Sequence, residues 1–377
     1  MAMTPELQTI TKGTSLKSEV NSTKQFKYRL THGISKRFNA FQVVIAEAYI
    51  NGLEVPDPIL KVLLNTYIPI IYQYFPSLMV PYEWLLKESD RLAEGSQELM
   101  RIQYNLPSDL FSTMLEEGDL LYPKYTMALW QNGALNLEQA QRHMLDDVIE
   151  KAEIKDGDEI LDLGCGWGSA ANYILSRFPN VKVISLNLSH EQCEYIRRKT
   201  HDPKSYLSSE RFNLYEVDFN DASFAIKFDK IIAVGLFEHV GNLTQSFQKL
   251  ASSLKADGKV FLHIITTTLS QNITHPFLNK YIFPYARAWN FDVIPALSQD
   301  LKTIDRWYLN GENYSRTLAC WLENFDQKQE QIKVLDYGLD YKKFRRMWRL
   351  YLILCIALFD SLKGEALGNG QYLLVHT

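Results

Sequence analysis

The chain has 377 residues, of which 46% are hydrophobic and 22% are charged, and its formal net charge is −4 at pH 7. This length suits one large domain or two smaller ones, and the mild charge balance gives no reason to expect a nucleic-acid partner. Four cysteines without C-x-x-C spacing provide neither a metal site nor a disulfide framework, which fits a reducing compartment.

Residues 1–40 are polar and carry a basic bias, and they lack the apolar core of a secretory signal. Their basic residues are Lys12, Lys17, Lys24, Lys27, Arg29, Lys36 and Arg37. The simpler prediction is a partly ordered tail, and the alternative is a weak anchor to acidic membrane lipid. With no signal peptide, we expect a cytoplasmic protein.

Residues 41–115 predict a helical accessory region. From Phe41 to about Glu98 the sequence is apolar and is interrupted by five prolines, which predicts several short helices. Asn136 and the glutamate two positions later are typical of a helix start, with the asparagine as the cap.

The stretch from Glu159 to Tyr173 reads E-I-L-D-L-G-C-G-W-G-S-A-A-N-Y. Its apolar start predicts a buried strand, and its alanine-bearing end predicts a helix. Between them, Gly164, Gly166 and Gly168 allow a tight turn and a close approach of the backbone to a ligand. The spacing is neither G-x-G-x-x-G nor that of a P-loop.

Asp162 stands at the end of this strand, just before the first glycine. A carboxylate there would repel a pyrophosphate but attract a cation. The loop therefore suits the amino group and sulfonium of S-adenosylmethionine better than a phosphate. The alternative is an ordinary glycine-rich turn between a strand and a helix.

Two further strands end in polar residues. The segment 181–186 predicts a buried strand, and the polar side chains after it are Asn187, Ser189 and Gln192. Ligands of open α/β sheets bind at such carboxyl ends. A third strand is expected to end at Asp218 and Phe219, which offer an adenine a hydrogen-bond acceptor and an apolar face. The alternative is a loop acid beside a core phenylalanine.

The remaining elements continue the alternation of strands and helices. A strand over 228–235, a helix over 244–254, a turn at 256–258 and a strand over 259–265 predict a mostly parallel, Rossmann-like sheet with helices on both faces. Beyond residue 270 the alternation breaks, which predicts a substrate cap over about 270–350 and the closing elements of the sheet. The apolar run 350–359 is about half of a bilayer span of roughly 20 residues, so we expect a buried helix.

Glu238 and His239 follow the fourth strand, at the same edge as the glycine loop. A carboxylate and an imidazole there can accept a proton from an ammonium substrate, with His239 taking it directly or through water and Glu238 orienting the ammonium. A structural pair, with a capping glutamate and a core histidine, is the alternative. His263 and Tyr314 are the other polar candidates for catalysis.

The string D-L-G-C-G-W-G resembles the first motif of S-adenosylmethionine-dependent methyltransferases with a Rossmann-like sheet. Its tryptophan variant resembles the cyclopropane-fatty-acid-synthase group, which also includes the coclaurine-type amine N-methyltransferases. The resemblance covers about 104–377 and implies a methyltransferase domain over 116–377 that converts S-adenosylmethionine to S-adenosylhomocysteine. It implies that Tyr125 and Thr126 contact the methionine part of the cofactor and that Asn187 stands at a position usually held by threonine.

In the cyclopropane synthases, residues matching Glu238, His263, Ile265 and Tyr314 hold a bicarbonate together with a cysteine. Met127 stands at the cysteine position, and methionine is larger and lacks an S–H donor. The amine N-methyltransferases keep most of this frame without using bicarbonate. The four retained residues therefore do not decide between the two branches.

Two features favour the amine branch. The stretch W-x-L-N-G-x-N-Y-x-R-T is similar to the coclaurine-type enzymes, and Trp348 and Tyr351 match aromatic positions of their alkaloid pocket. Because Trp348 and Tyr351 are spaced as on one face of a helix, they are equally consistent with a hydrophobic core. Against the amine branch, Ala128 stands where the plant enzymes carry a tyrosine.

We therefore expect an N-methyltransferase acting on a small aromatic or cyclic amine. Its expected substrate-binding residues are Met127, Glu238, His239, Tyr314, Trp348 and Tyr351. The enzyme alternative is a lipid-modifying cyclopropane synthase, for which the basic N-terminus would supply membrane attraction. The non-enzyme alternative is a degenerate cofactor-binding module, and the sequence leaves a homodimer open.

Overall fold

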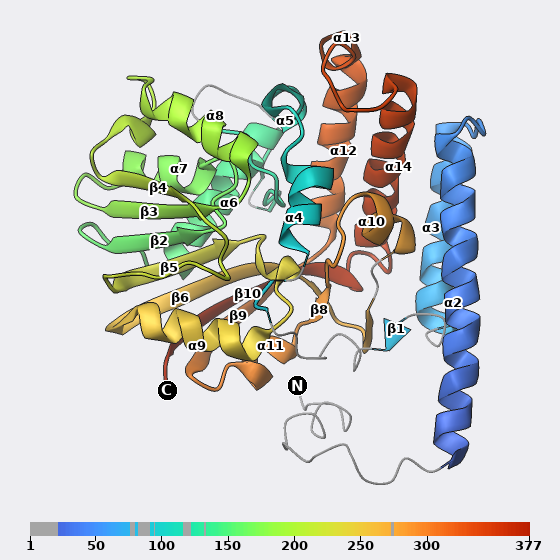
Figure 1. Ribbon diagram of the computed structural model, residues 1–377, viewed down its shortest axis with the longest axis horizontal. Helices are drawn as coiled ribbons and strands as arrows, with labels where there is room; N and C mark the ends of the chain where they lie inside the picture. Colours follow the sequence, from blue (N-terminus) through green and yellow to red (C-terminus); the bar gives the residue numbers. More distant parts are fainter. Residues whose placement is uncertain are drawn as a thin grey trace.

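The computed structural model describes residues 22–75, 80–81, 91–93, 95–115, 122–131, 133–272 and 275–377. Within these residues, seven strands form a sheet of order β4-β3-β2-β5-β6-β10-β9, and the short strand β8 pairs with β6 (Figure 1). The strands are β2 (Glu159–Leu163), β3 (Lys182–Asn187), β4 (Phe212–Glu216), β5 (Phe228–Val234), β6 (Leu254–Thr267), β8 (Trp289–Asn290), β9 (Leu301–Leu309) and β10 (Leu367–His376). A separate pair joins β1 (Val80–Pro81) to β7 (Gln271–Asn272).

The sheet is parallel from β4 to β6, and β10 runs antiparallel to both of its neighbours. Side chains of successive strand residues point to opposite faces. Ile160 and Leu161 of β2 accordingly belong to two different hydrophobic clusters, as do Phe261 and Leu262 of β6. Both faces of the sheet are therefore covered, which confirms the expected class of a mostly parallel sheet with helices on both faces.

Different helices supply the two clusters. One face is covered by α6 (Leu137–Lys151), α7 (Ser169–Arg177), α8 (His190–Thr200), α12 (Glu312–Gln327) and α14 (Tyr341–Asp360). The other face is covered by α9 (Leu243–Ser253) and α11 (Val293–Leu297). Asn136 caps α6 as expected, because its Oδ1 accepts a hydrogen bond from Gln139 N at 2.9 Å.

Three element boundaries differ from the expected ones. Strand β4 ends at Glu216, so Asp218 and Phe219 lie in the loop after it. The turn expected at 256–258 is wrong, because β6 already begins at Leu254 and a shift of register between Phe228 and Lys230 of β5 accommodates the extra residues. Strand β9 belongs to the edge of the sheet, so the expected cap over about 270–350 is not a continuous unit.

Two long helices precede the sheet, α2 (Ser22–Ile50) and α3 (Asp57–Tyr74). The boundary expected at residue 40 falls inside α2, and Pro69 lies inside α3 instead of ending it. The helices that follow are α4 (Ser96–Leu99), the π-helix η3 (Met100–Tyr104) and α5 (Ser108–Leu115). Over the residues described, the structure contains no helix that is both long and apolar enough to cross a membrane.

Four further short elements connect the larger ones among the described residues. They are η4 (Tyr206–Ser208), η5 (Phe237–His239), α10 (Pro276–Tyr281) and α13 (Gln329–Ile332). Helix α10 packs against α2, and α14 packs against both α2 and α3. The N-terminal helices are thus attached to the C-terminal half of the chain (Figure 1).

Candidate active site

The glycine loop joins β2 to α7, and its three glycines have positive φ angles of 76°, 55° and 81°. A Cβ at Gly168 would lie 3.0 Å from Leu207, so this glycine serves the packing of the loop. A Cβ at Gly166 would meet no heavy atom within 4 Å, and Gly166 lines a pocket at the carboxyl edge of the sheet. Gly166 is therefore the position where the backbone leaves room for a ligand.

This pocket, called here the glycine-loop pocket, contains most of the residues expected to bind a cofactor. Tyr125, Thr126, Asp162, Gly164, Gly166, Asn187, Gln192, Asp218 and Phe219 all line it. One oxygen of Asp218 is used by Asn220, which donates to it from its backbone and side chain. The ring of Phe219 is buried, with the Lys249 ammonium 5.1 Å from its centre.

Asp162 is 2% exposed, and its Oδ2 has no hydrogen-bond partner among the described residues. Burial raises the pKa of this carboxyl to about 7, because the charged form loses its hydration. A cationic group entering the pocket would restore the lost interaction. The geometry thus supports the cation-binding role predicted from the sequence.

Asn187 has another role in addition to lining the pocket. Its Nδ2 donates to Gly166 O at 2.8 Å and to Gln192 Oε1 at 2.9 Å, and its Oδ1 accepts from Ser189 N at 3.0 Å. These hydrogen bonds tie the end of β3 to the glycine loop and to the start of α8. Asn187 therefore fixes the shape of the pocket, and a threonine could not make this set of contacts.

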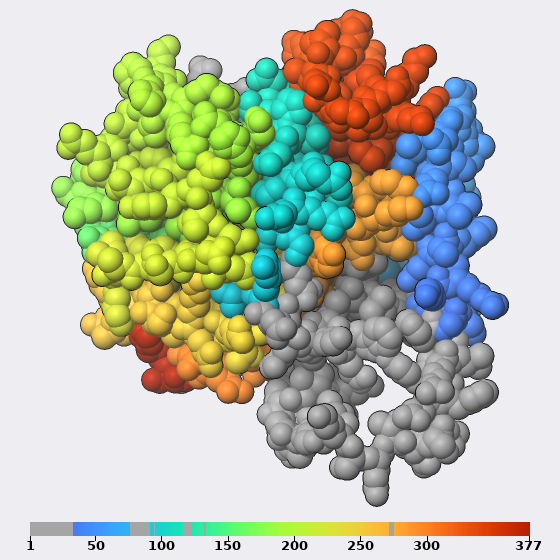
Figure 2. All heavy atoms as spheres, in the orientation of Figure 1, coloured from blue at the N-terminus to red at the C-terminus, as the bar shows by residue number. Residues whose placement is uncertain are grey.

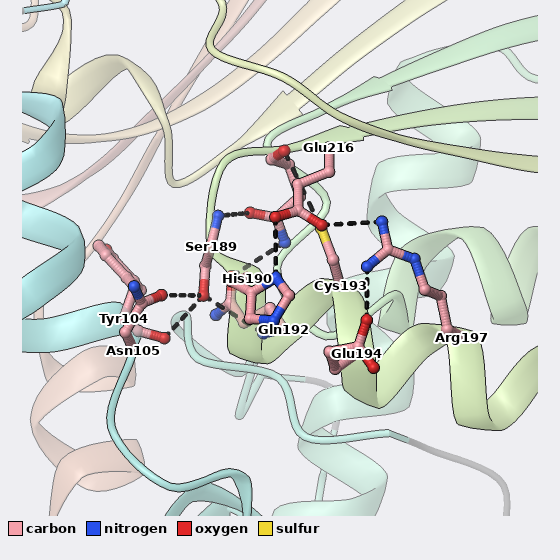
Figure 3. A network of polar contacts seen from close by, with 10 residues as sticks. Tyr104, Asn105, Ser189, His190, Gln192, Cys193, Glu194, Arg197 and Glu216 are labelled. Atoms are coloured by element: carbon pink, nitrogen blue, oxygen red, sulfur yellow. Dashed lines mark hydrogen bonds and ion pairs between the residues drawn. The ribbon is translucent and has the colours of Figure 1, made fainter.

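Ser189 does not line the glycine-loop pocket and is fully buried. It caps α8, and its Oγ donates to Tyr104 O at 2.7 Å and lies 3.0 Å from Asn105 Oδ1 (Figure 3). Tyr104 ends the segment 95–104, which supplies Ser96, Leu99 and Met100 to the pocket wall. The structure therefore places Ser189 where it anchors a covering segment, and not in the pocket.

A second cavity, called here the inner cavity, adjoins the glycine-loop pocket. The two share Tyr104, Tyr125, Thr126, Gly235 and His239 in their walls. The expected catalytic residues Glu238, His239, His263 and Tyr314 all line the inner cavity, together with Ile265 and Tyr351. The structure thus brings together side chains from β6, α12, α14 and the segment after β5.

Glu238 is buried, and its Oε1 accepts a hydrogen bond from Ile265 N at 2.6 Å. Its Oε2 has no partner among the described residues. Burial raises the pKa of Glu238 to about 7, and the hydrogen bond from Ile265 only partly offsets this effect. Glu238 is therefore a carboxyl that can exchange a proton near neutral pH.

His239 stands between the two cavities, and its Nε2 lies 3.1 Å from the Tyr104 hydroxyl. Burial, followed by the nearby positive charge of Arg287, lowers the pKa of His239 to about 4. The ring is therefore neutral at pH 7. If Tyr104 donates to Nε2, the ring carries its proton on Nδ1, which has no partner among the described residues.

His263 is fully buried, and both ring nitrogens are in contact with side-chain amides. Its Nε2 lies 3.0 Å from Asn369 Nδ2, and its Nδ1 lies 3.3 Å from Gln371 Nε2. Burial and the charges of Lys124 and Lys151 lower the pKa of His263 to about 3. Because of these contacts, His263 is a structural residue of the cavity wall and is not available as a base for the substrate.

Two expected substrate residues do not line either cavity. Met127 is fully buried, and Trp348 is 1% exposed between Phe325 and Phe344. Trp348 therefore belongs to the core, which is the alternative that its helical spacing left open. Tyr351 lines the inner cavity, and its hydroxyl lies 2.6 Å from that of Tyr125.

Three residues of the site were not assigned a role from the sequence. Tyr104 contacts His239, and Cys355 lines the inner cavity one helical turn after Tyr351. Lys124 lines the glycine-loop pocket and donates to Thr126 O at 3.2 Å and to Met127 O. Cys355 follows Tyr351 by four residues, and this helical spacing could have indicated that both side chains line the same cavity. Lys124 gave no signal in the sequence beyond its place beside Tyr125.

Comparison with known proteins gives a consistent result. The model of the family described as mycolic acid cyclopropane synthetase matches residues 93–365. The chain is 33% identical to the cyclopropane-fatty-acyl-phospholipid synthase of Escherichia coli (strain K12), over 68% of this chain but only 63% of that enzyme's length. It is 26% identical to the (S)-coclaurine N-methyltransferase of Papaver somniferum, over 78% of this chain and 88% of that protein.

Solved structures show the same fold. A coclaurine N-methyltransferase bound to N-methylheliamine and S-adenosylhomocysteine superposes with a TM-score of 0.75 at 22% identity, covering 88% of this chain and 99% of that one. A cyclopropane synthase from Mycobacterium tuberculosis superposes with a TM-score of 0.65 at 23% identity, covering 76% of this chain and 99% of that one. The two kinds of enzyme share the architecture described above.

Proposed function

Because the chain belongs to the mycolic acid cyclopropane synthetase family, we propose that it transfers a methyl group from S-adenosylmethionine to the nitrogen of a small aromatic or cyclic amine. Relatives of both kinds, N-methyltransferases and cyclopropane synthases, support methyl transfer as the reaction class. The choice of an amine as acceptor rests on the residues of the inner cavity.

The glycine-loop pocket fits S-adenosylmethionine. The unpartnered carboxylate oxygen of Asp162 would meet the cationic methionine part, and the open space at Gly166 would admit the ligand beside the backbone. Asp218 and Phe219, in the same pocket, would hold the adenine. When bound, this cofactor would supply a methyl group on a sulfonium: an in-line nucleophile would form a bond to the methyl carbon, and the S–C bond would break with its electron pair left on sulfur.

The observation that carries the amine proposal is a buried carboxyl among aromatic rings. Glu238 shares the inner cavity with Tyr104, Tyr125, Phe283, Tyr314 and Tyr351. Aromatic faces and a carboxylate both stabilise a protonated or quaternary amine. Because Glu238 and Tyr314 match positions of both branches, the preference for an amine rests on the other aromatic rings of the cavity, Tyr104, Phe283 and Tyr351. Glu238 precedes His239, which lines both cavities, so its carboxyl would lie near the bound cofactor.

The pKa values favour roles for Glu238 and His239 that are the reverse of those expected from the sequence. Nucleophilic attack requires the lone pair of the amine, so a proton must leave the ammonium. Glu238, with a pKa of about 7, is a better proton acceptor than His239, whose pKa is about 4. We therefore assign proton removal to Glu238 and orientation of the substrate to neutral His239, held by Tyr104.

The direct test uses cofactor carrying a labelled methyl group. The protein is incubated with this cofactor and, in separate reactions, with a panel of secondary and tertiary cyclic amines or with unsaturated phospholipid vesicles. Label in an amine product supports the proposal. Label found only in the lipid fraction would contradict it.

One observation favours the lipid alternative. Glu238, His263, Ile265 and Tyr314, which match bicarbonate-binding positions, converge in the inner cavity, and Cys355 supplies a thiol to the same cavity. The absence of a cysteine at position 127 therefore does not by itself exclude a small anion there. Against it, the Ile265 N–H is already donated to Glu238, and both His263 nitrogens contact amides. A strict requirement for bicarbonate in the assay would favour this alternative.

A further inference from the structure

Strand β10 carries two amide side chains on the face of the sheet that borders the inner cavity. In its antiparallel pairing with β6, Asn369 lies opposite Ile265 and Gln371 lies opposite His263. Residues two apart on a strand point to the same face, so these four side chains lie together. Asn369, Ile265 and His263 line the inner cavity, whereas Gln371 does not.

His263 lies between the two amides. Its Nε2 is 3.0 Å from the amide of Asn369, and its Nδ1 is 3.3 Å from the amide of Gln371. Because burial lowers the pKa of His263 to about 3, the ring is neutral and carries a single proton. One ring nitrogen must therefore donate a hydrogen bond to its amide, and the other must accept one.

Contacts on the other side of Gln371 decide which ring nitrogen carries the proton. Gln371 Oε1 accepts a hydrogen bond from the Lys151 ammonium at 2.6 Å, and Gln371 Nε2 donates to Asp147 Oδ2 at 2.7 Å. Turning this amide over would bring its NH2 group against an ammonium and its oxygen against a carboxylate. Gln371 Nε2 therefore donates to His263 Nδ1, and the ring proton is on Nε2.

A protonated Nε2 determines the orientation of the Asn369 amide. With Nδ2 of Asn369 beside it, two N–H groups would face each other. The oxygen and nitrogen of an amide occupy nearly the same space, so the hydrogen-bond network decides which of them faces the ring. When Oδ1 accepts from His263, the NH2 group takes the other place, which has no partner among the described residues. Asn369 is 1% exposed, so this NH2 group is a buried donor at the inner cavity.

Glu238 and Asn369 lie on opposite sides of Ile265. Glu238 Oε1 accepts a hydrogen bond from Ile265 N, and Asn369 is on the strand that pairs with Ile265 from the other side. Neighbouring strands are about 4.8 Å apart, so two groups that flank β6 are separated by roughly 8 Å. One small molecule can therefore contact the unpartnered oxygen of Glu238 and the NH2 group of Asn369 at the same time.

Two covering elements complete the wall of the inner cavity. Tyr104 belongs to the segment 95–104, and Leu278 and Asn279 belong to α10. Both elements lie at the surface of the molecule in the space-filling view, the first in cyan and α10 in orange (Figure 2). A buried amide donor without a partner is costly, and a ligand oxygen that accepts from Asn369 removes this cost.

We propose, building on the proposed transfer of a methyl group to an amine, that Asn369 determines substrate specificity by donating a hydrogen bond from its amide to an oxygen of the substrate. The substrate is then an amine that also carries an ether or hydroxyl oxygen, with its nitrogen at Glu238 and its oxygen at Asn369. Asp147, Gln371 and His263 position the amide and do not contact the substrate.

The first experiment tests the network without any substrate. Long-range proton–nitrogen correlation spectra of the full chain with isotope-labelled histidine, bound to S-adenosylhomocysteine, show which ring nitrogen carries the proton. The His263 signals are identified by their loss in His263→Gln. We expect the proton on Nε2 of His263. A proton on Nδ1 would overturn the proposal, because Asn369 would then direct its oxygen toward the cavity.

The second experiment compares methyl transfer to phenylpyrrolidine with transfer to its ortho-, meta- and para-methoxy derivatives, which place an oxygen at three distances from the nitrogen. For the wild type we expect one isomer to have a kcat/KM about three- to tenfold above that of phenylpyrrolidine. Asn369→Asp keeps an acceptor for His263 but has no donor, and Asn369→Leu has neither, so both should lose this preference. Measuring wild type and variants with the same amines removes differences in intrinsic reactivity.

The outcomes separate the role of Asn369 from amine methylation itself. Equal rates with all four amines in the wild type would overturn the proposal and leave amine methylation intact, and so would a preference that survives in both variants. A preference that added bicarbonate abolishes, together with a shift of the Asn369 amide signals, would assign the amide to an anion and also overturn it. Label in none of the amines would contradict the proposed function, and with it the role of Asn369.

A third experiment turns the amide over from a distance. In the double variant Asp147→Asn with Gln371→Glu, a carboxylate oxygen faces His263 Nδ1, so the ring proton should move to Nδ1 and Asn369 should direct its oxygen into the cavity. The methoxyl preference should disappear, although neither substituted residue lines the cavity. The matched control is Asp146→Asn on the same helix, because Asp146 accepts from Tyr173 and lies outside the network. A double variant that moves the proton but keeps the full preference would overturn the proposal.

Discussion

At the scale of single residues, the two cavities have one feature in common, a buried carboxyl with one oxygen that no described residue satisfies. Asp162 provides it in the glycine-loop pocket, and Glu238 provides it in the inner cavity. Burial raises the pKa of each to about 7. Leaving a buried carboxylate oxygen unpaired is costly, so both positions are best explained by ligands that supply the missing partner.

Asp162 should make cofactor affinity depend on pH. In the free protein Asp162 is largely protonated below pH 7, and a cationic ligand needs the carboxylate. We therefore expect the affinity for S-adenosylmethionine to fall by about tenfold for each pH unit below 7. Isothermal titration calorimetry from pH 5.5 to 8, in buffers of different ionisation enthalpy, measures both the affinity and the proton released.

Two variants identify the carboxyl that causes this pH dependence of the affinity. Asp162→Asn should bind the cofactor more weakly and lose the pH dependence. Glu238→Gln is the matched control, because it removes the other carboxyl of similar pKa and should keep the dependence. If Asp162→Asn retained the full pH dependence, another group would be responsible for it.

Glu238 and His239 should differ in how their loss changes the pH profile. Both Glu238→Gln and His239→Asn are expected to lower turnover by about 10²–10⁴-fold, with cofactor affinity nearly unchanged. Wild-type turnover should rise with pH through an inflection near 7, where Glu238 loses its proton. Only Glu238→Gln should abolish that inflection.

The amine itself offers an independent check on these two variants. As pH approaches the pKa of the amine, free base becomes abundant and the loss of turnover should shrink. Steady-state rates with a labelled cofactor, measured from pH 6 to 9.5, give both results. Full turnover in both variants at neutral pH would mean that the pair is structural.

Individual residues were predictable from the sequence where a motif fixed the backbone around them. Asp162, Gly166 and Asp218 lie in the pocket because strand ends and the glycine loop determine their place in any sheet of this order. Trp348 was less predictable, because the periodicity of α14 does not indicate which face meets the cavity and which meets Phe325. Contacts such as Tyr104 with His239 join residues 135 positions apart and have no local signal.

At the scale of elements, the glycine loop gives a direct test of cofactor binding. Gly166→Val should abolish the binding of S-adenosylmethionine, because the new side chain would occupy the open space in the pocket and β-branched residues are strained at a φ of 55°. The matched control is Gly157→Val, since Gly157 has a φ of 91° and no heavy atom within 4 Å of a built Cβ, but does not line the pocket.

Calorimetry of unfolding and of cofactor binding in both variants distinguishes the effect of backbone strain from that of a side chain blocking the pocket. Gly157→Val should lose stability and keep its affinity, whereas Gly166→Val should lose both. Unchanged affinity in a folded Gly166→Val protein would remove the basis for placing the cofactor in this pocket.

Ser189 joins two elements, and two substitutions separate its roles. Its side chain caps α8 and also donates to Tyr104 O in the covering segment (Figure 3). Ser189→Ala should lose about 1 kcal/mol of stability through the missing cap, and it should also bind the cofactor more weakly. Ser189→Asp retains a capping oxygen but cannot donate to Tyr104 O, so it should weaken binding with a smaller loss of stability. Equal affinity in all three proteins, by calorimetry, would contradict a role for this hydrogen bond in covering the pocket.

Elements were predicted best where their hydrophobic pattern was simple. The alternation of strands and helices from β2 to β6 follows from short apolar runs between turn residues, and it was expected correctly. The start of β6 was wrong because Ala256, Asp257 and Gly258 are typical of turns, yet they lie within β6, in the irregular stretch between the residues Leu254 and Lys259 that pair with β5. Pro69 was expected to interrupt a helix, but packing of α3 on α14 outweighs one lost backbone hydrogen bond.

At the scale of the whole molecule, burial of titratable groups couples stability to pH. Burial lowers the pKa of His239 and His275 to about 4 and that of His263 to about 3, all below the ordinary value of 6.5. Below pH 6.5 the unfolded chain therefore binds three protons that the folded chain does not bind, and the free energy of unfolding falls. Asp162 and Glu238 act in the opposite direction, because between pH 4.5 and 7 they are protonated when folded and ionised when unfolded.

These five groups together determine how the stability of the cofactor-free protein changes between pH 6 and pH 5. In this window the unfolded chain binds three more protons at the histidines, and the folded chain binds two more protons at the carboxyls. The unfolded chain therefore binds one proton more in total, and the free energy of unfolding should fall by about 1.4 kcal/mol for each unit by which the pH decreases. His275→Asn should bring this slope close to zero, and an asparagine can still cap α10 as His275 does through Nδ1. Asp162→Asn should instead double the slope, because it removes one of the two opposing groups. Urea denaturation at several pH values measures all three slopes, and an unchanged slope in His275→Asn would show that this histidine is protonated in the folded protein as well.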